Sequence, residues 1–135
     1  MAGTFSCSVV TPEKAILDVD DAVQVVFPAY DGEMGIMAGR APLLSRLGIG
    51  RLRLKTASGE EQLFFVDGGF AQMVDNRLTI LTEQALALDE ISESAALSAQ
   101  ETADAIAPGG DERTYLQRQA ALERARQLRR LAARN

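Results

Sequence analysis

Residues 61–83 read EQLFFVDGGFAQMVDNRLTILTE and contain three apolar runs separated by two groups of turn-forming residues. The separators are Asp67-Gly68-Gly69 and Asp75-Asn76, and Gly, Asn and Asp favour turns because they tolerate positive φ angles. The stretch therefore predicts three strands joined by two turns, with successive strands antiparallel.

The same organisation continues toward the N-terminus. Apolar and polar residues alternate in 4–10, 22–27 and 51–56, the period of a half-buried strand. The side chains predicted to face inward are Phe5, Cys7, Val9, Val23, Val25, Phe27, Leu52 and Leu54, with Arg51, Arg53 and Lys55 outward. Short strands with turns at close spacing predict a sandwich or barrel.

The composition changes after Asp89, where the chain becomes rich in Ala, Glu, Gln and Leu. We expect Asp89 to cap one helix, Pro108-Gly109-Gly110 to end it, and Asp111 to cap a second. The expected apolar faces are Ile91, Ala95, Ala99, Ala103 and Ile106 on the first, and Ala121, Leu122, Ala125, Leu128 and Ala132 on the second. Alanine faces bury little area, so we expect a hairpin that can detach.

The predicted fold class is therefore α+β. Residues 1–87 form an antiparallel β-sandwich, and residues 88–135 form an antiparallel helical hairpin. A length of 135 residues suits one small domain with an appendage.

Several kinds of site are excluded by composition. The chain has no histidine, which removes imidazole bases, His-metal sites and Ser-His triads together. Its one cysteine, Cys7, cannot form an internal disulfide, and its alternation with Phe5 and Val9 predicts a buried strand position. The N-terminus lacks the basic and apolar regions of a secretory signal, so we expect the protein to stay where it is made.

Charge is distributed unevenly along the chain. Residues 1–110 hold seven Lys or Arg against sixteen Asp or Glu, a balance of −9. Residues 111–135 hold seven Arg against three acids, a balance of +4. A basic tail of this kind favours an acidic partner: nucleic acid, an anionic membrane or an acidic protein surface.

A second unusual stretch is GEMGIMAGRAPLL, Gly32 to Leu44, which has three glycines within eight residues and soft apolar residues between them. One interpretation is a hairpin loop whose methionines pack on the sandwich. The other is a docking surface.

Taken together, this stretch, the later Gly68-Gly69-Phe70 with Val74, and the strand ending LTILTEQA resemble the epsilon subunit of the F-type ATP synthase, called delta in mitochondria. The resemblance extends over essentially the whole chain. It implies a non-catalytic rotor subunit whose sandwich packs on the gamma subunit, sits on the ring of c subunits and helps couple proton flow to ATP synthesis. It also implies a hairpin that either folds on the sandwich or extends into the catalytic head and inhibits ATP hydrolysis.

The resemblance also carries residue roles. It places the c-ring docking loop at Asp31, Gly32, Glu33, Met34, Gly35, Ile36 and Arg40. Arg40 stands where the family usually has His, and Ala38 where it often has Pro, so a fixed cation replaces a titratable group. In the family the second helix meets an acidic motif on the catalytic β subunit, a role that falls here to Arg113, Arg118, Arg124, Arg126, Arg129 and Arg130.

Some family members bind ATP through an I-D-x-x-R-A-like segment. Here Ser92 replaces its carboxylate and Ala95 its arginine, so we expect weak or absent ATP binding. No other cofactor, metal or catalytic residue is predicted. GIGRLR lacks the ending of a P-loop, DVDD lacks the rest of a calcium loop, and Asp67 is interpreted as turn chemistry.

Three alternatives stay open. A nucleic-acid-binding module could use the arginine helix, although Tyr115 is its one aromatic residue for stacking. A small carboxylate enzyme lacks a paired constellation of acids. The same subunit could serve a hydrolysis-specialised or sodium-translocating complex. The partners implied place the protein at the cytoplasmic face of a bacterial inner membrane, or the organelle equivalent, as a peripheral subunit that does not insert into lipid.

Overall fold

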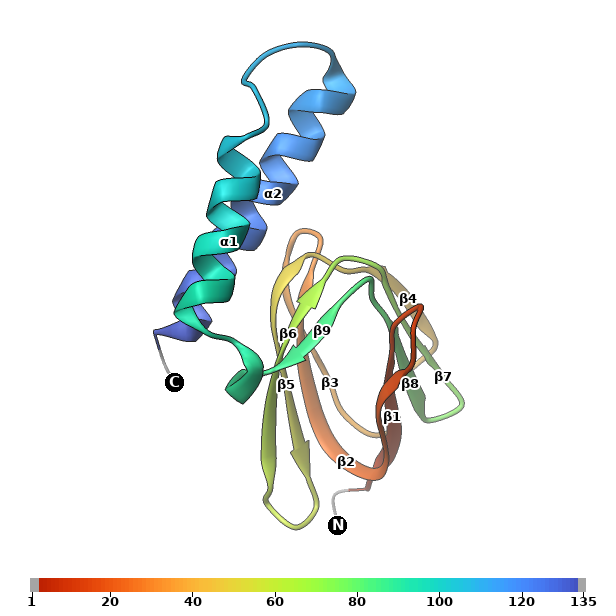
Figure 1. The fold of residues 1–135 in the computed structure, drawn as a ribbon. Helices are drawn as coiled ribbons and strands as arrows, with labels where there is room; N and C mark the ends of the chain where they lie inside the picture. The colour runs from red at the N-terminus through yellow and green to blue at the C-terminus, as the bar shows by residue number, and fades with distance from the viewer. Residues whose placement is uncertain (1–2, 134–135) are drawn as a thin grey trace.

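The computed structural model describes residues 3–133 and consists of a β-sandwich followed by two packed helices (Figure 1). The strands are β1 (Phe5–Val10), β2 (Ala15–Ala29), β3 (Gly32–Ile36), β4 (Leu43–Arg46), β5 (Ile49–Thr56), β6 (Glu61–Asp67), β7 (Phe70–Val74), β8 (Arg77–Leu81) and β9 (Ala85–Ala87). A 3₁₀ turn, η1 (Leu88–Glu90), leads to the helices α1 (Glu93–Asp104) and α2 (Glu112–Ala132). The predicted fold class is confirmed.

The strands pair in the order β4-β7-β8-β1-β2-β5-β6-β9, with β3 also on β2. The first half of the long β2 pairs with β1, and its second half pairs with β5 and β3, so this strand passes from one layer to the other. Every pair is antiparallel except β1 with β8. Local turn signals could not predict that parallel pair, because it joins segments about 70 residues apart in sequence.

All the predicted strands are present, but the predicted alternation of inward and outward side chains is wrong at one position of β2. In β2 the buried residues are Ala22, Val25 and Phe27, whereas Val23 is half-buried. The β2–β5 register shifts between Ala22 and Gln24. An extra residue at such a bulge interrupts the alternation of side chains, so the prediction that Val23 faces inward is wrong.

The interior between the layers is apolar and filled mainly by the inward residues of the strands. Its largest fully buried members include Phe5, Phe27, Leu52, Leu54, Met73, Leu78 and Ile80. Cys7 is buried among them, as predicted. Burial, helped by the nearby Asp18 carboxylate, raises the pKa of the Cys7 thiol to about 12, so this thiol stays protonated at neutral pH.

The start of the first helix differs from the prediction. Asp89 lies in the 3₁₀ turn, and the N-cap of α1 is Ser92, whose Oγ accepts a hydrogen bond from the Ala95 amide at 3.1 Å. Ile91 is extended and separates the two elements, so Asp89 cannot cap the longer helix. Asp111 caps α2 as predicted, with its carboxylate accepting from the Thr114 amide at 2.8 Å.

The two helices pack together, and the second half of α2 lies against β5 and β6 (Figure 1). The far end of the hairpin, at residues 105–111, projects away from the sandwich. On α2 the buried stripe is Ala121, Ala125, Leu128, Leu131 and Ala132. Leu131 therefore takes the buried place that the sequence prediction gave to Leu122, which is half-buried.

The contact between hairpin and sandwich contains large apolar side chains as well as alanines. Phe65 of β6 forms one buried cluster with Ile91, Ala96, Leu128, Leu131 and Ala132. Large side chains thus contribute from the sandwich and from α2, and each fully buried Leu or Phe contributes about 1.5–3 kcal/mol. The hairpin is docked in this structure by a compact apolar contact.

Candidate functional site

Most of the predicted docking loop forms the β2–β3 hairpin. Tyr30 and Asp31 make its two-residue turn, and Gly32, at φ +139°, begins β3. The Tyr30 amide donates to the Arg46 carbonyl at 2.9 Å, and the Arg46 guanidinium lies 4.9 Å from the centre of the Tyr30 ring. These contacts hold the turn against the end of β4.

The side chains of this hairpin divide between surface and core. Asp31, Gly32, Glu33 and Gly35 are exposed, and Met34 is half-buried against the core. Ile36 is fully buried because it pairs with Val25 on the inward side of the sheet. Of the predicted docking residues, Ile36 therefore packs in the core and offers no side-chain surface to a partner.

Arg40 lies at the opposite end of β3 from Asp31 and Glu33. It follows a turn in which the Gly39 amide donates to Asn76 Oδ1 at 3.0 Å, while Asn76 Nδ2 donates to the Thr4 carbonyl at 2.8 Å. This network ties the segment after β3 to the β7–β8 turn and to the start of the chain. Asp31 thus precedes β3 and Glu33 lies near its start, whereas Arg40 comes four residues after the strand ends.

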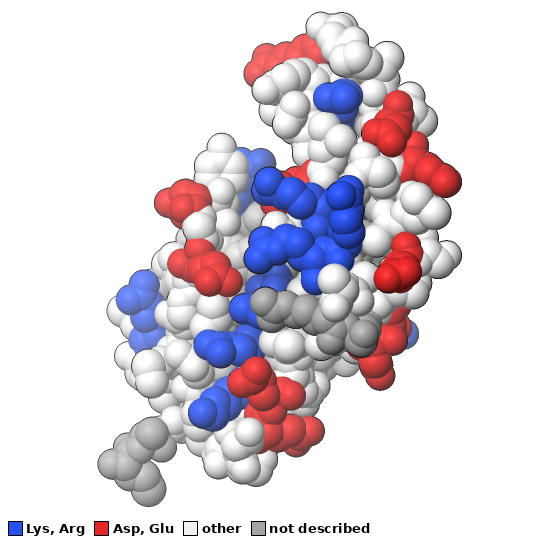
Figure 2. Space-filling model, turned by 90° about the vertical axis from the view of Figure 1, so that its left-hand side faces the viewer, with Lys and Arg blue, Asp and Glu red and all other residues white. Residues whose placement is uncertain are grey.

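Four of the six arginines predicted to bind an acidic partner are engaged within the chain, Arg124 among them. Arg118 Nε donates to the Ile106 carbonyl at 3.2 Å, and Arg129 Nη2 donates to Gln100 Oε1 at 2.8 Å. Arg126 pairs with Glu123 on its own helix. The side chains of Arg113 and Arg130 are exposed and donate no hydrogen bond to any group among residues 3–133. Figure 2 shows Lys and Arg side chains gathered on the helical part and continuing over the sandwich.

Arg124 makes the one ion pair between hairpin and sandwich in the described part of the chain. Its Nε and Nη2 atoms lie 2.5 and 3.2 Å from the two oxygens of Asp67, at the end of β6. The Asp67 side chain is 12% exposed and that of Arg124 33%. A two-point guanidinium–carboxylate contact fixes distance and orientation together, so this pair positions α2 on the sandwich.

Local structure holds Asp67 in place for that contact. Its amide donates to Thr82 Oγ1 at 3.0 Å, and Thr82 Oγ1 donates to the Gln84 carbonyl at 3.2 Å. Gly69 follows at φ +101°, where a Cβ atom would lie 1.8 Å from the Leu81 carbonyl oxygen. The sequence pattern predicts a turn role for Asp67 and gives no sign of this ion pair, since nothing local relates Asp67 to a residue 57 positions later.

One face of the sandwich presents apolar side chains to solvent. Leu44 of β4, Phe70 and Val74 of β7, and Leu81 of β8 are 68%, 51%, 39% and 50% exposed. These three strands are neighbours, and Phe70 is directly paired with Leu81 and Arg46. Adjacent exposed apolar residues on paired strands favour a protein-binding surface. We call these four residues the β4-β7-β8 face.

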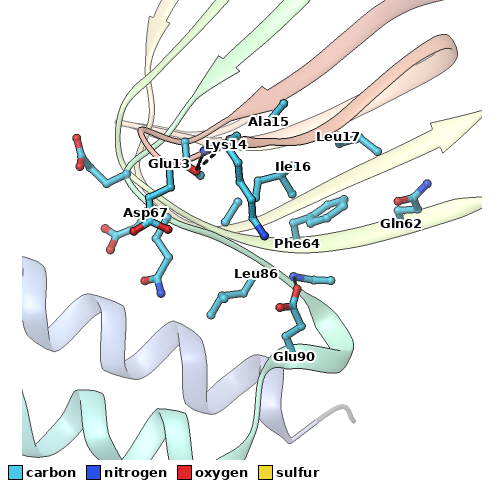
Figure 3. Close-up of a pocket in the computed structure, with 15 residues that line it drawn as sticks. Glu13, Lys14, Ala15, Ile16, Leu17, Gln62, Phe64, Asp67, Leu86 and Glu90 are labelled. Atoms are coloured by element: carbon cyan, nitrogen blue, oxygen red, sulfur yellow. Dashed lines mark hydrogen bonds between the residues drawn. The ribbon is translucent and has the colours of Figure 1, made fainter.

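A cavity of about 810 Å³ lies where the β1–β2 turn faces β6 and β9 (Figure 3). Lys14 extends into it beside Phe64, and Glu13, Asp67, Glu83 and Glu90 contribute carboxylates to its walls. No group of His, Cys, Asp and Glu in the described residues is arranged to hold a metal ion. Among those residues, too, no helix is long and apolar enough to cross a membrane.

The fold and these surfaces define the class of protein: a β-sandwich carrying a docked, arginine-rich helical hairpin. Residues 4–88 match the family described as ATP synthase, Delta/Epsilon chain, beta-sandwich domain. The chain belongs to this ATP synthase family, and the resemblance found in the sequence is confirmed.

Its curated relatives include ATP synthase epsilon chains. That of Rhodopirellula baltica is 50% identical over 86 residues, which cover 64% of this chain and 66% of the relative, slightly less than two thirds. A sodium ion specific epsilon chain from Propionigenium modestum is 41% identical over 88 residues, covering 65% and 63%. That of Gloeothece citriformis is 35% identical over 127 residues, covering 91% of both chains.

Solved structures agree with these matches. A chain in the OSCP/F1/c-ring structure of Euglena gracilis mitochondrial ATP synthase has a TM-score of 0.80 and 26% identity, covering 96% of this chain and 82% of that one. A chain from the central stalk/c-ring structure of Tetrahymena thermophila mitochondrial ATP synthase has a TM-score of 0.73 and 16% identity, and shows the common fold alone.

Proposed function

We propose that the protein is a non-catalytic subunit of the central stalk of an F-type ATP synthase. Its sandwich anchors on the gamma subunit and the c ring and transmits torque, and so helps couple proton translocation to ATP synthesis. Its hairpin inhibits ATP hydrolysis when α2 engages an acidic surface of the catalytic head. The observation that carries this proposal is the division of the chain into a family sandwich and a separately docked, arginine-rich hairpin.

Two surfaces of the sandwich support the anchoring role. The β4-β7-β8 face has the apolar character of a lasting protein contact, and we assign it to the gamma subunit. The exposed Asp31-Gly32-Glu33 turn offers carboxylates and backbone polar groups at one end of the sandwich, and we assign it to the polar loops of the c ring. Arg40, at the other end, then contacts a different surface or none.

The hairpin supports the regulatory role through its charges. In the docked state Arg118, Arg124 and Arg129 bond to groups of this chain. Undocking exposes the Arg124 guanidinium for a carboxylate of a partner, with which arginine forms the same two-point contact. The Asp67–Arg124 pair and an acidic site on the catalytic head therefore compete for one side chain.

ATP binding on the hairpin is proposed to be weak or absent. The two positions that would bring a carboxylate and an arginine are Ser92 and Ala95, and Ser92 is occupied as the N-cap of α1. With its assigned partners, the protein is a peripheral subunit at the cytoplasmic face of a bacterial inner membrane or its organelle equivalent.

The test measures ATP hydrolysis by a catalytic head that lacks this subunit. Full-length protein, residues 1–88, and a full-length variant with Arg113, Arg126 and Arg130 changed to Gln are added in turn. We expect all three to bind gamma and only the unaltered chain to inhibit fully. Circular dichroism checks that the shortened chain keeps its strands. Inhibition by residues 1–88 would remove the regulatory role, and loss of gamma binding by all three would remove the anchoring role.

A nucleic-acid-binding role has one supporting observation, the arginine surface in Figure 2. The acidic balance of residues 1–110 opposes it, because phosphate backbones are repelled by a net charge of −9. A gel shift at moderate salt separates the two proposals: retarded duplex or single-stranded DNA would favour the alternative. Coupling to sodium in place of protons is equally compatible with this chain, because the coupling ion binds elsewhere in the complex.

A further inference from the structure

A second pocket, about 380 Å³, lies where α2 meets the β2–β3 turn. The apolar residues of its lining are Pro28, Ala29, Ile49 and Leu131. Two arginines line it from opposite parts of the molecule, Arg51 of β5 and Arg130 of α2. The pocket therefore exists only while the hairpin is docked.

Neither arginine forms an ion pair with a residue of this chain between 3 and 133. Among residues 3–133 the two ion pairs are Arg124 with Asp67 and Arg126 with Glu123, and the side chains of Arg51 and Arg130 donate no hydrogen bond to these residues. Docking thus brings two positive side chains to the lining of one pocket, and a bound anion would offset their repulsion.

The acids around the pocket compensate that charge only in part. Glu33 lines the pocket but is exposed and forms no ion pair within residues 3–133. Glu123, two turns before Arg130, already accepts hydrogen bonds from Arg126 and Gln127. Burial opposes ionisation of Glu123, but these bonds and the charges of Arg126 and Arg130 hold its pKa below the usual value.

We propose that this pocket binds a small phosphate-type oxyanion between Arg51 and Arg130. Guanidinium groups bind phosphate oxygens in pairs, and two of them from different parts of the chain form a clamp. The lining includes no aromatic ring on which a nucleobase could stack, so the site takes the free oxyanion in preference to a nucleotide. Because the clamp joins β5 to α2, the bound anion stabilises the docked hairpin.

The test uses full-length protein and inorganic phosphate. Amide chemical shifts are followed by NMR during a sodium phosphate titration, with ionic strength held constant by sodium chloride. We expect saturable shifts at Gly32, Ile49 and Gln127. Arg51→Gln and Arg130→Gln should each weaken binding by about tenfold or more, the loss of one charge-assisted contact. Glu33→Gln should tighten binding, since it removes the one carboxylate in the lining.

Arg53→Gln is the matched control, because Arg53 is two residues along the same strand and does not line the pocket. Shifts that do not saturate, or that persist unchanged in both Arg51→Gln and Arg130→Gln, would overturn the proposal. So would ATP binding at the same amides far more tightly than phosphate.

A second readout follows the hairpin itself. Phosphate should slow amide hydrogen exchange in the second half of α2 of the unaltered protein and leave exchange in Arg130→Gln unchanged. Equal slowing in both proteins would contradict the clamp. Both measurements use the isolated chain and do not depend on inhibition of ATP hydrolysis, so failure here leaves the proposed function standing.

Discussion

Arg124 of α2 and Asp67 of β6 form a two-point ion pair that joins the hairpin to the sandwich, although 57 positions separate them in sequence. Asp67 is largely buried, while a third of the Arg124 side chain remains exposed. Removing one partner of such a pair leaves the other without compensation, which costs more than the pair contributes.

Replacing Asp67 by Asn should weaken docking of the hairpin by about 1–2 kcal/mol. A charge-assisted hydrogen bond contributes energy on this scale, and solvent at the partly exposed Arg124 screens part of it. Amide hydrogen exchange in residues 121–132 measures the change. Salt should weaken docking in the unaltered chain and have much less effect in Asp67→Asn. Arg113→Gln, on the same helix but distant from Asp67, is the control; an equal loss in that variant would contradict the assignment.

Gly69 is predicted to tolerate no side chain. A Cβ there would lie 1.8 Å from the Leu81 carbonyl oxygen, at a φ of +101°. Gly69→Ala should therefore destabilise the sandwich by on the order of 3 kcal/mol or more, through backbone strain and displacement of β8. Urea unfolding followed by circular dichroism measures the difference.

The neighbouring glycine supplies the matched comparison for that substitution. Gly68 also has positive φ, +67°, but a Cβ there meets nothing within 4 Å. Gly68→Ala should lower the stability of the fold by only about 1–2 kcal/mol, the cost of holding an alanine in the left-handed conformation. Equal losses in the two variants would show that close approach to Leu81 is not the cause.

The sequence was informative where structure is decided locally. Alternation predicted the strands, Asp111 predicted the cap of α2, and the flanking strand pattern predicted burial of Cys7. It was misleading where one local signal competes with another: Ser92, three residues past Asp89, caps α1 because Ile91 is extended.

Long-range relationships lay beyond the sequence pattern. The parallel β1–β8 pair, the bulge that moves Val23 outward, and the partner of Asp67 all depend on which segments meet in space. The predicted docking residues show the same limit. A contiguous motif in sequence becomes an exposed turn, a buried Ile36 and a distant Arg40, because a strand runs through its centre.

Cys7 should resist thiol reagents in the folded protein. It is fully buried, and its raised pKa of about 12 leaves very little thiolate at pH 8. Labelling by a thiol reagent should therefore proceed at the rate of global unfolding and accelerate in parallel with unfolding measured by circular dichroism in urea. Rapid labelling without denaturant would show local opening of β1.

The cap of α2 should be sensitive to acid. Hydrogen bonds from the Thr114 backbone and side chain lower the pKa of Asp111 below its ordinary value of 3.8. A lowered folded-state pKa means that the stabilisation is complete above 3.8 and is lost as pH falls through the lowered value. Helical circular dichroism should decrease in that range.

Asp111→Asn isolates this effect from other carboxylates, since Asn also caps helices but does not titrate there. The difference in helical circular dichroism between the two proteins should not change with pH above the ordinary pKa of Asp and should diminish below it. A difference that stays constant down to the lowest pH would contradict a titrating cap.

The β4-β7-β8 face provides the most direct test of the proposed anchor. Phe70→Ser and Leu81→Ser remove adjacent exposed apolar side chains whose loss leaves the core unchanged. If the face packs on gamma, each change should weaken binding by about tenfold or more, the usual cost of removing a central apolar contact. Surface plasmon resonance on immobilised gamma measures the affinity.

Leu97→Ser is the control for this experiment, because Leu97 is also apolar and exposed but lies on α1. It should leave gamma binding by the docked chain unchanged. If Leu97→Ser weakened binding while Phe70→Ser and Leu81→Ser did not, the hairpin would be the anchor. Torque would then pass through the seam of Phe65, Leu128 and Leu131, and the docked hairpin could not be a detachable brake.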